Sequence, residues 1–396
     1  MQTVALYDFS PVLQLMLTGL GLAMGPLAWI WLRHPKASTA QRLRVLTLVT
    51  LFLTFDLVVF GAFTRLTDSG LGCPDWPGCY GSASPLGAQL HIDAAQTAMP
   101  SGPVTHPKAW IEMIHRYLAT TVGVLILTLA VGTWAARRRK SAAAGSASTL
   151  SLWWPVATLL WVCLQGAFGA LTVTMKLFPA IVTLHLLGGL VLLALLRAQS
   201  VAYAQRANPA IFAPRNLSIG LWWWVLASFA ALWVQIALGG WVSTNYAVLA
   251  CTDFPACQQS LWPAMDFRQG FTLWRSLGGG DGGGNISFQA LTAIHYTHRL
   301  AAYVVGALLL GLSFKLNQLP AFRNDARWLG GLILLQVVTG LSNVVLGWPL
   351  IAAVAHTGGA AALVVVMTGI IFSSRPYTAR LPKAHASTSG VTRLTA

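Results

Sequence analysis

Side chains that could carry acid–base or metal chemistry stand together inside one apolar stretch. Glu112 and His115 are spaced so that a helix would place them on one face. Arg116 follows at once, and Glu112 is the only glutamate in the chain. A titratable group within a membrane-length apolar segment indicates a functional site by default. This stretch is therefore the first candidate for a reactive centre.

Four of the nine histidines form a repeated set at similar depth near the outer ends of apolar segments: His115, His185, His298 and His356. We expect His115 to pair with His185, and His298 with His356. Neutral imidazole is the commonest metal ligand. Two facing histidines in a helical bundle suit a planar macrocycle, with haem the main candidate. Zinc fits less well, because no third ligand is repeated beside them. Hydrogen-bonded core histidines are the alternative.

An arginine follows the first histidine of each pair, at Arg116 and Arg299. A guanidinium group binds carboxylates, and haem carries two propionates. An arginine near the outer interface could equally contact lipid phosphate. The glycine pairs 188–189 and 358–359 follow the second histidines, where they would admit either a flat ligand or a neighbouring helix. Both questions stay open at this level.

Two cysteine pairs share one spacing, Cys73 with Cys79 and Cys251 with Cys257. This spacing is not that of a zinc ribbon. Two local disulfides, one per outer loop, are the favoured interpretation, and an exposed redox-active pair is the alternative. Cys163 lies within an apolar segment and is predicted to be an inert packing residue.

The composition of the chain indicates the kind of protein in which these residues lie. The chain has 396 residues, of which 56% are hydrophobic and 9% charged, with a mean hydropathy of +0.64. A soluble domain carries about 25% charge, so the chain is predicted to be an integral membrane protein. The net charge of +15 would suit nucleic acid, but the distribution of that charge indicates membrane topology instead, and we expect no nucleic-acid partner.

Nine apolar segments are long enough to span a bilayer at about 20 residues each. They lie near 11–32, 44–65, 110–134, 153–175, 180–198, 220–243, 293–314, 328–347 and 350–372. The first segment lacks the basic region and cleavage site of a signal peptide. Eighteen of the 25 basic residues fall on one side of this topology. The positive-inside rule then predicts a cytoplasmic C-terminus and a periplasmic N-terminus. Asp56, near the middle of the second segment, is predicted to be a buried carboxyl of undecided role.

An internal repeat organises the chain. Gly61–Cys79 aligns with Gly239–Cys257 at an offset of 178, and the histidine-bearing segments align at offsets of 183 and 171. The predicted fold is an all-α membrane protein with two pseudo-repeated four-helix bundles, an eight-helix core, plus one extra N-terminal transmembrane helix. The predicted divisions are 1–43 for the extra helix, 44–198 and 220–372 for the two halves, 199–219 for a linker and 373–396 for a tail.

The run from Gly61 to Cys79, GAFTRLTDSGLGCPDWPGC, together with the motif Glu112-x-x-His115-Arg116, resembles the haem A synthase family. The resemblance extends over about 44–372. It implies an enzyme of the bacterial inner membrane that oxidises a methyl group of haem O to a formyl group. The product, haem A, serves the assembly of cytochrome oxidase.

The resemblance also implies roles for individual residues. His115 and His185 would hold the substrate haem O, and His298 and His356 a stable haem b. Glu112 would be the essential acid–base group. The Cys73–Cys79 pair would form a disulfide tied to haem handling. The second half has His295 where the first has Glu112, which agrees with one reactive site and one electron-transfer site.

The implied partners are haem O and haem A, membrane lipid, haem O synthase and cytochrome oxidase assembly factors, with a homo-oligomer left open. Two other functions compete with haem A synthesis. One is a di-haem b protein that oxidises quinol without modifying haem. The other is a haem chaperone or exporter with labile sites. The first of these predicts that Glu112 is dispensable.

Overall fold

The computed structural model describes residues 10–141, 151–279 and 284–377. Within these ranges, nine helices are long and apolar enough to cross a membrane, which confirms the predicted multi-pass helical fold. The elements run in the order α1 (Ser10–Arg33), α2 (Thr39–Leu66), α3 (Gln89–Ala98), α4 (His106–Ser141), α5 (Trp153–Thr174), α6 (Pro179–Ala207), β1 (Arg215–Ser218), α7 (Ile219–Thr244), η1 (Ala247–Ala250), α8 (Phe267–Gly270), α9 (Phe288–Asn317), η3 (Pro320–Phe322), α10 (Arg323–Val345), α11 (Leu350–Phe372) and β2 (Ser374–Tyr377).

Polar signals at the helix ends explain where the long helices begin. Ser38 and Gln41 form a reciprocal capping box at the start of α2. Ser218 caps α7 and Ser287 caps α9, each by accepting a main-chain N–H of the first turn. Pro179 occupies the first turn of α6, where its missing N–H costs nothing. Several helices therefore extend beyond the apolar segments that predicted them.

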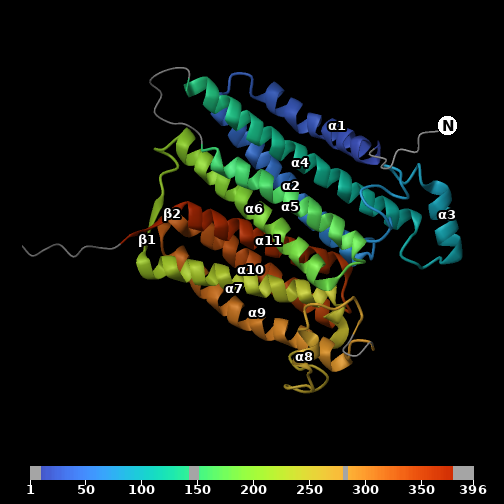
Figure 1. Cartoon of the computed structure of the whole chain (residues 1–396). Coiled ribbons are helices and arrows are strands. Elements are labelled where there is room, and N and C mark those ends of the chain that lie inside the picture. Colours follow the sequence, from blue (N-terminus) through green and yellow to red (C-terminus); the bar gives the residue numbers. More distant parts are fainter. Residues whose placement is uncertain (1–9, 142–150, 280–283, 378–396) are drawn as a thin grey trace, which may run out of the picture.

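The membrane helices form two similar halves that lie side by side (Figure 1). In the first half, α2 packs on α4 and α6, and α5 packs on α4 and α6. In the second half, α9 packs on α7 and α10, and α10 packs on α11. The two halves meet through α2 and α6 on one side and α7 and α11 on the other.

Residues at the outer ends of α2 and α7 bring equivalent positions of the sequence repeat into contact, as a two-fold relation between the halves would require. Nη2 of Arg65 donates to the carbonyl of Ser243 at 2.7 Å, and the hydroxyl of Tyr246 donates to Oδ1 of Asp68 at 2.6 Å. Each contact joins residues 178 positions apart, which is the offset of the repeat. A residue that touches its own repeat equivalent must lie near the symmetry axis.

The extra helix α1 packs mainly on α4 of the first half. A methyl group on Gly19 would lie 2.7 Å from Cβ of Thr120, so the two helices approach closely at that point. Leu15 of α1 joins a buried apolar cluster that contains both Cys73 and Cys79. The helix outside the repeat thus covers the first cysteine loop.

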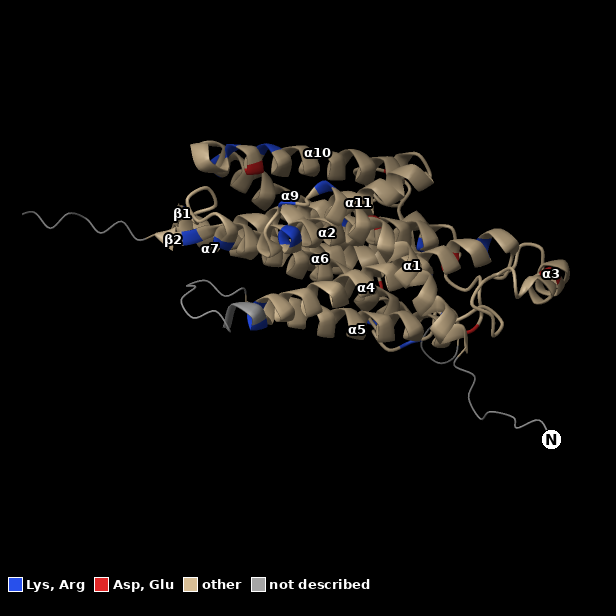
Figure 2. Ribbon diagram, turned by 90° about the horizontal axis from the view of Figure 1, so that it is seen from above, with Lys and Arg blue, Asp and Glu red and all other residues tan. Residues whose placement is uncertain are grey.

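A short parallel sheet, absent from the predicted all-α fold, joins β1 to β2 at one end of the molecule. Residues coloured as Lys and Arg gather toward this end, while α3 projects from the opposite end (Figure 2). The predicted linker 199–219 includes the last two turns of α6 and all of β1. Residues 1–9, the glycines 280, 282 and 283, and most of the predicted tail lie outside the described ranges.

Candidate haem-binding site

The first histidine pair lies between the four helices of the first half. His115 on α4 and His185 on α6 are close enough to interact electrostatically. A methyl group on Gly61 of α2 would lie 3.2 Å from Nε2 of His115. A methyl group on Gly169 of α5 would lie 3.4 Å from Cε1 of His185. Each imidazole therefore rests against a helix position that has no side chain.

The second pair repeats this arrangement. His298 on α9 lies near His356 on α11. A methyl group on Gly239 of α7 would lie 2.9 Å from Cε1 of His298, and one on Gly340 of α10 would lie 3.2 Å from Cε1 of His356. The sequence repeat aligns Gly239 with Gly61, and Gly340 follows Gly169 by 171 positions, the same offset that relates His356 to His185. Their reason for being glycine, which is space for an imidazole, appears only in the folded chain.

The donor set fits a macrocycle better than a bare metal ion. Within the described residues, no group of three or more His, Cys, Asp or Glu side chains could hold a metal ion. Each half instead offers two imidazoles, and Nδ1 of His185 is buried without a hydrogen-bond partner. Two imidazoles with glycine behind each ring would be suited to hold haem iron.

The glycine pairs after the second histidines serve helix packing. A methyl group on Gly188 would lie 1.8 Å from Nε2 of Gln165, and one on Gly359 would lie 2.2 Å from Nε2 of Gln336. Gln336 also donates to the carbonyl of His356 at 2.9 Å. These two glycines therefore accommodate a glutamine from the neighbouring helix, the second of the two roles that the sequence left open.

Glu112 joins the first histidine pair to the first cysteine loop. Its side chain lies on α4 one turn before His115, and the residue is only 4% exposed. Oε2 accepts the N–H of Cys73 at 2.8 Å, and Oε1 forms an ion pair with Arg116. The salt bridge to Arg116 is therefore not the only contact of the carboxylate. The acid is held by both a charge and a loop amide.

His295 occupies the equivalent place in the second half and makes a different contact. Nδ1 of His295 lies 3.0 Å from the carbonyl of Ala247 in η1. The residue is 5% exposed. The second half therefore uses a neutral ring to hold its outer segment where the first half uses a carboxylate, and the acid is found beside one histidine pair only.

Both predicted disulfides are present, Cys73–Cys79 and Cys251–Cys257. An exposed redox-active pair was the alternative, but all four cysteines are 0% exposed. Cys163, predicted to pack inside, instead lies on the exposed face of α5. Asp56 likewise is exposed on α2 rather than buried, because it shares a helix face with exposed Phe52.

An aspartate shapes each disulfide loop. Asp75 accepts the N–H groups of Tyr80 and Gly81, and its repeat equivalent Asp253 accepts those of Gln258 and Gln259. The N–H groups of Gln259 and Gln258 lower the pKa of the Asp253 carboxyl, since they stabilise its charged form. The two loops are therefore built alike despite their different sequences.

The arginines after the first histidines hold these loops. Nη1 of Arg116 donates to the carbonyls of Asp75 and Pro77 at 3.1 and 3.0 Å, and also to that of Gly78. Nη1 of Arg299 donates to the carbonyl of Asp253 at 2.9 Å and to that of Ala256 at 2.8 Å. Each guanidinium thereby ties a disulfide loop to a histidine-bearing helix. Main-chain acceptors of this kind have no signature in the sequence.

Two polar side chains that the sequence had not singled out touch the second histidine pair. Nε2 of Gln235 lies 3.1 Å from Nδ1 of His298. Oγ1 of Thr339 lies 2.9 Å from Nδ1 of His356. Their repeat equivalents in the first half are the apolar Leu57 and Phe168. A comparison of the two halves for positions that are polar in one and apolar in the other would have identified them. The repeat was instead used to find residues that both halves share.

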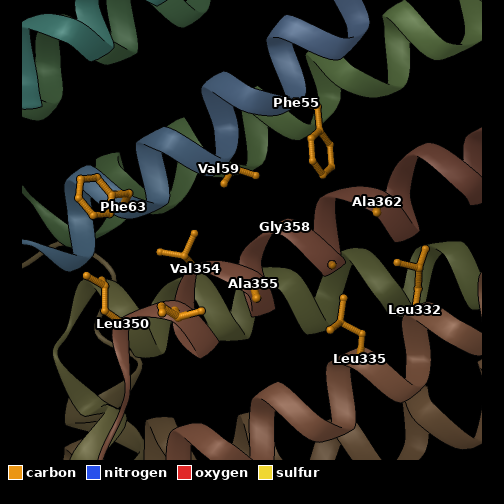
Figure 3. A pocket seen from close by; sticks show the side chains of 12 residues that line it. Phe55, Val59, Phe63, Leu332, Leu335, Leu350, Val354, Ala355, Gly358 and Ala362 are labelled. Atoms are coloured by element: carbon orange, nitrogen blue, oxygen red, sulfur yellow. The ribbon is translucent and has the colours of Figure 1, made fainter.

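An apolar groove of about 560 Å³ lies between α2, α10 and α11, and no histidine lines it (Figure 3). Phe55, Val59 and Phe63 line it from α2, facing Gly358 and Ala362 of α11. All twelve lining residues are apolar. The groove offers surface for van der Waals contact but no group for acid–base chemistry, so the histidine pairs remain the candidate site.

The chain matches the COX15-CtaA family, described as cytochrome oxidase assembly protein, over residues 44–368. It is 37% identical to a protein named Heme A synthase from Shewanella oneidensis, over 81% of this chain and 93% of that relative. Proteins of the same name from Halalkalibacterium halodurans and Caulobacter vibrioides are each 25% identical, over 75% and 82% of this chain and 85% and 93% of their own lengths. The matched range begins after α1.

Proposed function

Because the chain belongs to the COX15-CtaA family of cytochrome oxidase assembly proteins, we propose that it is a haem A synthase that converts haem O to haem A. Relatives of that name align with most of this chain and with most of their own length. The observation that carries the proposal is an asymmetry. Both halves hold a histidine pair, but only the first places a carboxylic acid one turn from a ligand.

We assign the substrate haem O to His115 and His185, and a resident haem b to His298 and His356. When bound, haem b would supply an electron-transfer centre. Glu112 then acts as the proton-handling group of the first site. Arg116 and the N–H of Cys73 hold the carboxylate on the side of α4 that bears His115.

The arginines have a further expected role that their loop contacts leave standing. Arg116 and Arg299 lie beside the first histidine of each pair, so haem propionates remain predicted partners. We expect the glycine behind each imidazole to be as important for haem binding as the arginines. Each site would then have its two histidines inside the bundle and an arginine at its outer rim.

Substituting the glycine behind a ligand tests the second site directly. Gly239→Ala should weaken haem b binding roughly 10-fold, because overpacking costs about 1–3 kcal/mol and the added methyl would lie 2.9 Å from His298. Gly306→Ala on α9 is the control, since nothing lies within 4 Å of its position. Haem b per purified protein is the measurement. Equal haem contents in the two variants would contradict the assignment.

Co-expression with a haem O source tests the proposed function. Extracted haems should include haem A, and the purified protein should retain haem b. A di-haem quinol oxidase would instead yield two permanent b haems and no change in haem O. A haem exporter would yield unmodified, labile haem. Absence of any oxidised haem O product would overturn the proposal.

We further propose that the protein lies in a bacterial inner membrane with its C-terminus in the cytoplasm. The grouping of basic residues at the end that carries β1 and β2 supports this orientation (Figure 2). The disulfide loops then face an oxidising compartment, where such bonds persist. Haem O synthase and assembly factors of cytochrome oxidase are the expected partners, and a homo-oligomer is compatible with this arrangement.

A further inference from the structure

The two histidine pairs differ in what holds their rings. In the second half, Thr339 contacts Nδ1 of His356 and Gln235 contacts Nδ1 of His298. In the first half, Nδ1 of His185 is buried with no hydrogen-bond partner. No hydrogen bond to the ring of His115 is present in the described part of the chain. The same fold thus presents one supported pair and one unsupported pair.

Thr339 can support the iron-binding tautomer of His356. Its hydroxyl lies 2.7 Å from the carbonyl of Leu335 and 2.9 Å from Nδ1 of His356. When the hydroxyl hydrogen goes to Leu335, the oxygen is free to accept a proton carried by Nδ1. Nε2 is then the unprotonated nitrogen, which is the form that binds iron.

Gln235 restrains the other ring of the pair. Its amide nitrogen lies 3.1 Å from both Nδ1 and the main-chain carbonyl of His298. Its carbonyl oxygen Oε1 is buried without a partner. A rotated amide would set Oε1 against the carbonyl oxygen of His298, and two acceptors cannot bond. Gln235 therefore holds the ring of His298 in place through Nε2.

We propose that Thr339 and Gln235 are positioning residues that make the second pair a permanent haem site, and that Phe168 and Leu57 keep the first pair exchangeable. An accepting group behind a ligating histidine fixes its tautomer and raises its basicity. An apolar side chain in the same place does neither. A substrate haem must leave as product, whereas a resident haem must stay. The proposal rests on the assignment of resident and substrate haems given above.

Substitution of the threonine tests the proposal. Thr339→Val keeps the shape and removes the hydroxyl, and should speed the loss of haem b to an acceptor protein about 10-fold. The midpoint potential of the remaining haem b should rise, because a less basic ligand stabilises the oxidised iron less. Thr339→Ser should restore both values. Thr128→Val is the control, because Thr128 bonds only to its own helix. Unchanged haem loss and potential in Thr339→Val would overturn the proposal.

The converse change tests the first half. Phe168→Thr and Phe168→Val have the same shape and differ by one hydroxyl at the repeat equivalent of Thr339. The threonine variant should retain more haem O and haem A after purification, by about 10-fold. Chromatography of the extracted haems separates these from haem b, so the haem content of each half is measured independently. Equal retention in the two variants would overturn the exchange part of the proposal. A parent protein without haem b would contradict the proposed function itself.

Discussion

Glu112→Gln is expected to lower the formation of haem A by about 100-fold or more, the usual contribution of a general acid or base, while leaving haem b in place. The amide keeps the size of the side chain and one acceptor for the N–H of Cys73. It cannot carry the charge that pairs with Arg116 or exchange a proton. The measurements are haem A yield from a haem O source and haem b content.

The control must separate chemistry from the shape of the loop. Asp75→Asn weakens the same disulfide loop, because Asp75 accepts two of its amides, but it leaves the acid intact. We expect this variant to keep most of its activity. If Asp75→Asn lowers haem A formation to the same extent, the effect of Glu112→Gln comes from the altered disulfide loop rather than from the lost acid. Near-normal turnover of Glu112→Gln would remove the carboxylate from the mechanism.

His356→Ala should abolish haem b binding and, with it, haem A formation. The change removes one of the two histidines of the second pair and leaves Thr339 without the ring nitrogen that it contacts. His185→Ala should instead keep haem b and lose the bound substrate haem. The two variants are read by the absorption of the purified proteins and by the extracted haems.

His106→Ala is the matched control for these histidine variants. His106 begins α4 more than two turns before His115, and it pairs with Asp93 at 2.6 Å rather than with another histidine. We expect normal content of both haems. Loss of haem b from His185→Ala but not from His356→Ala would mean that the first half holds haem b and the second half holds the substrate haem.

The sequence predicts the helices and the pairing of the histidines because both have strong signatures. Apolar length predicts each span, and the repeat pairs the histidines and the cysteines. Helix starts were less well predicted, since caps such as Ser38 and Ser287 lie outside the apolar runs. Short β1 and β2 have no such signal, because four residues of strand are set by tertiary context.

The chemistry around the ligands was harder to predict for a physical reason. Arg116 and Arg299 bind main-chain carbonyls, which every residue possesses. Thr339 and Gln235 are ordinary polar residues of apolar helices until the fold sets them beside an imidazole. The burial of the cysteines also depends on distant partners, because Leu15 of α1 covers the first pair.

The packing of α1 has a consequence for how the chain is made. Gly19 meets Thr120, about 100 residues later in the sequence. At a synthesis rate of about 5–20 residues per second, α1 waits in the membrane for roughly 5–20 s before α4 is complete. During that interval the first cysteine loop emerges without its cover. Cys73 and Cys79 are therefore accessible for oxidation until α1 packs on α4.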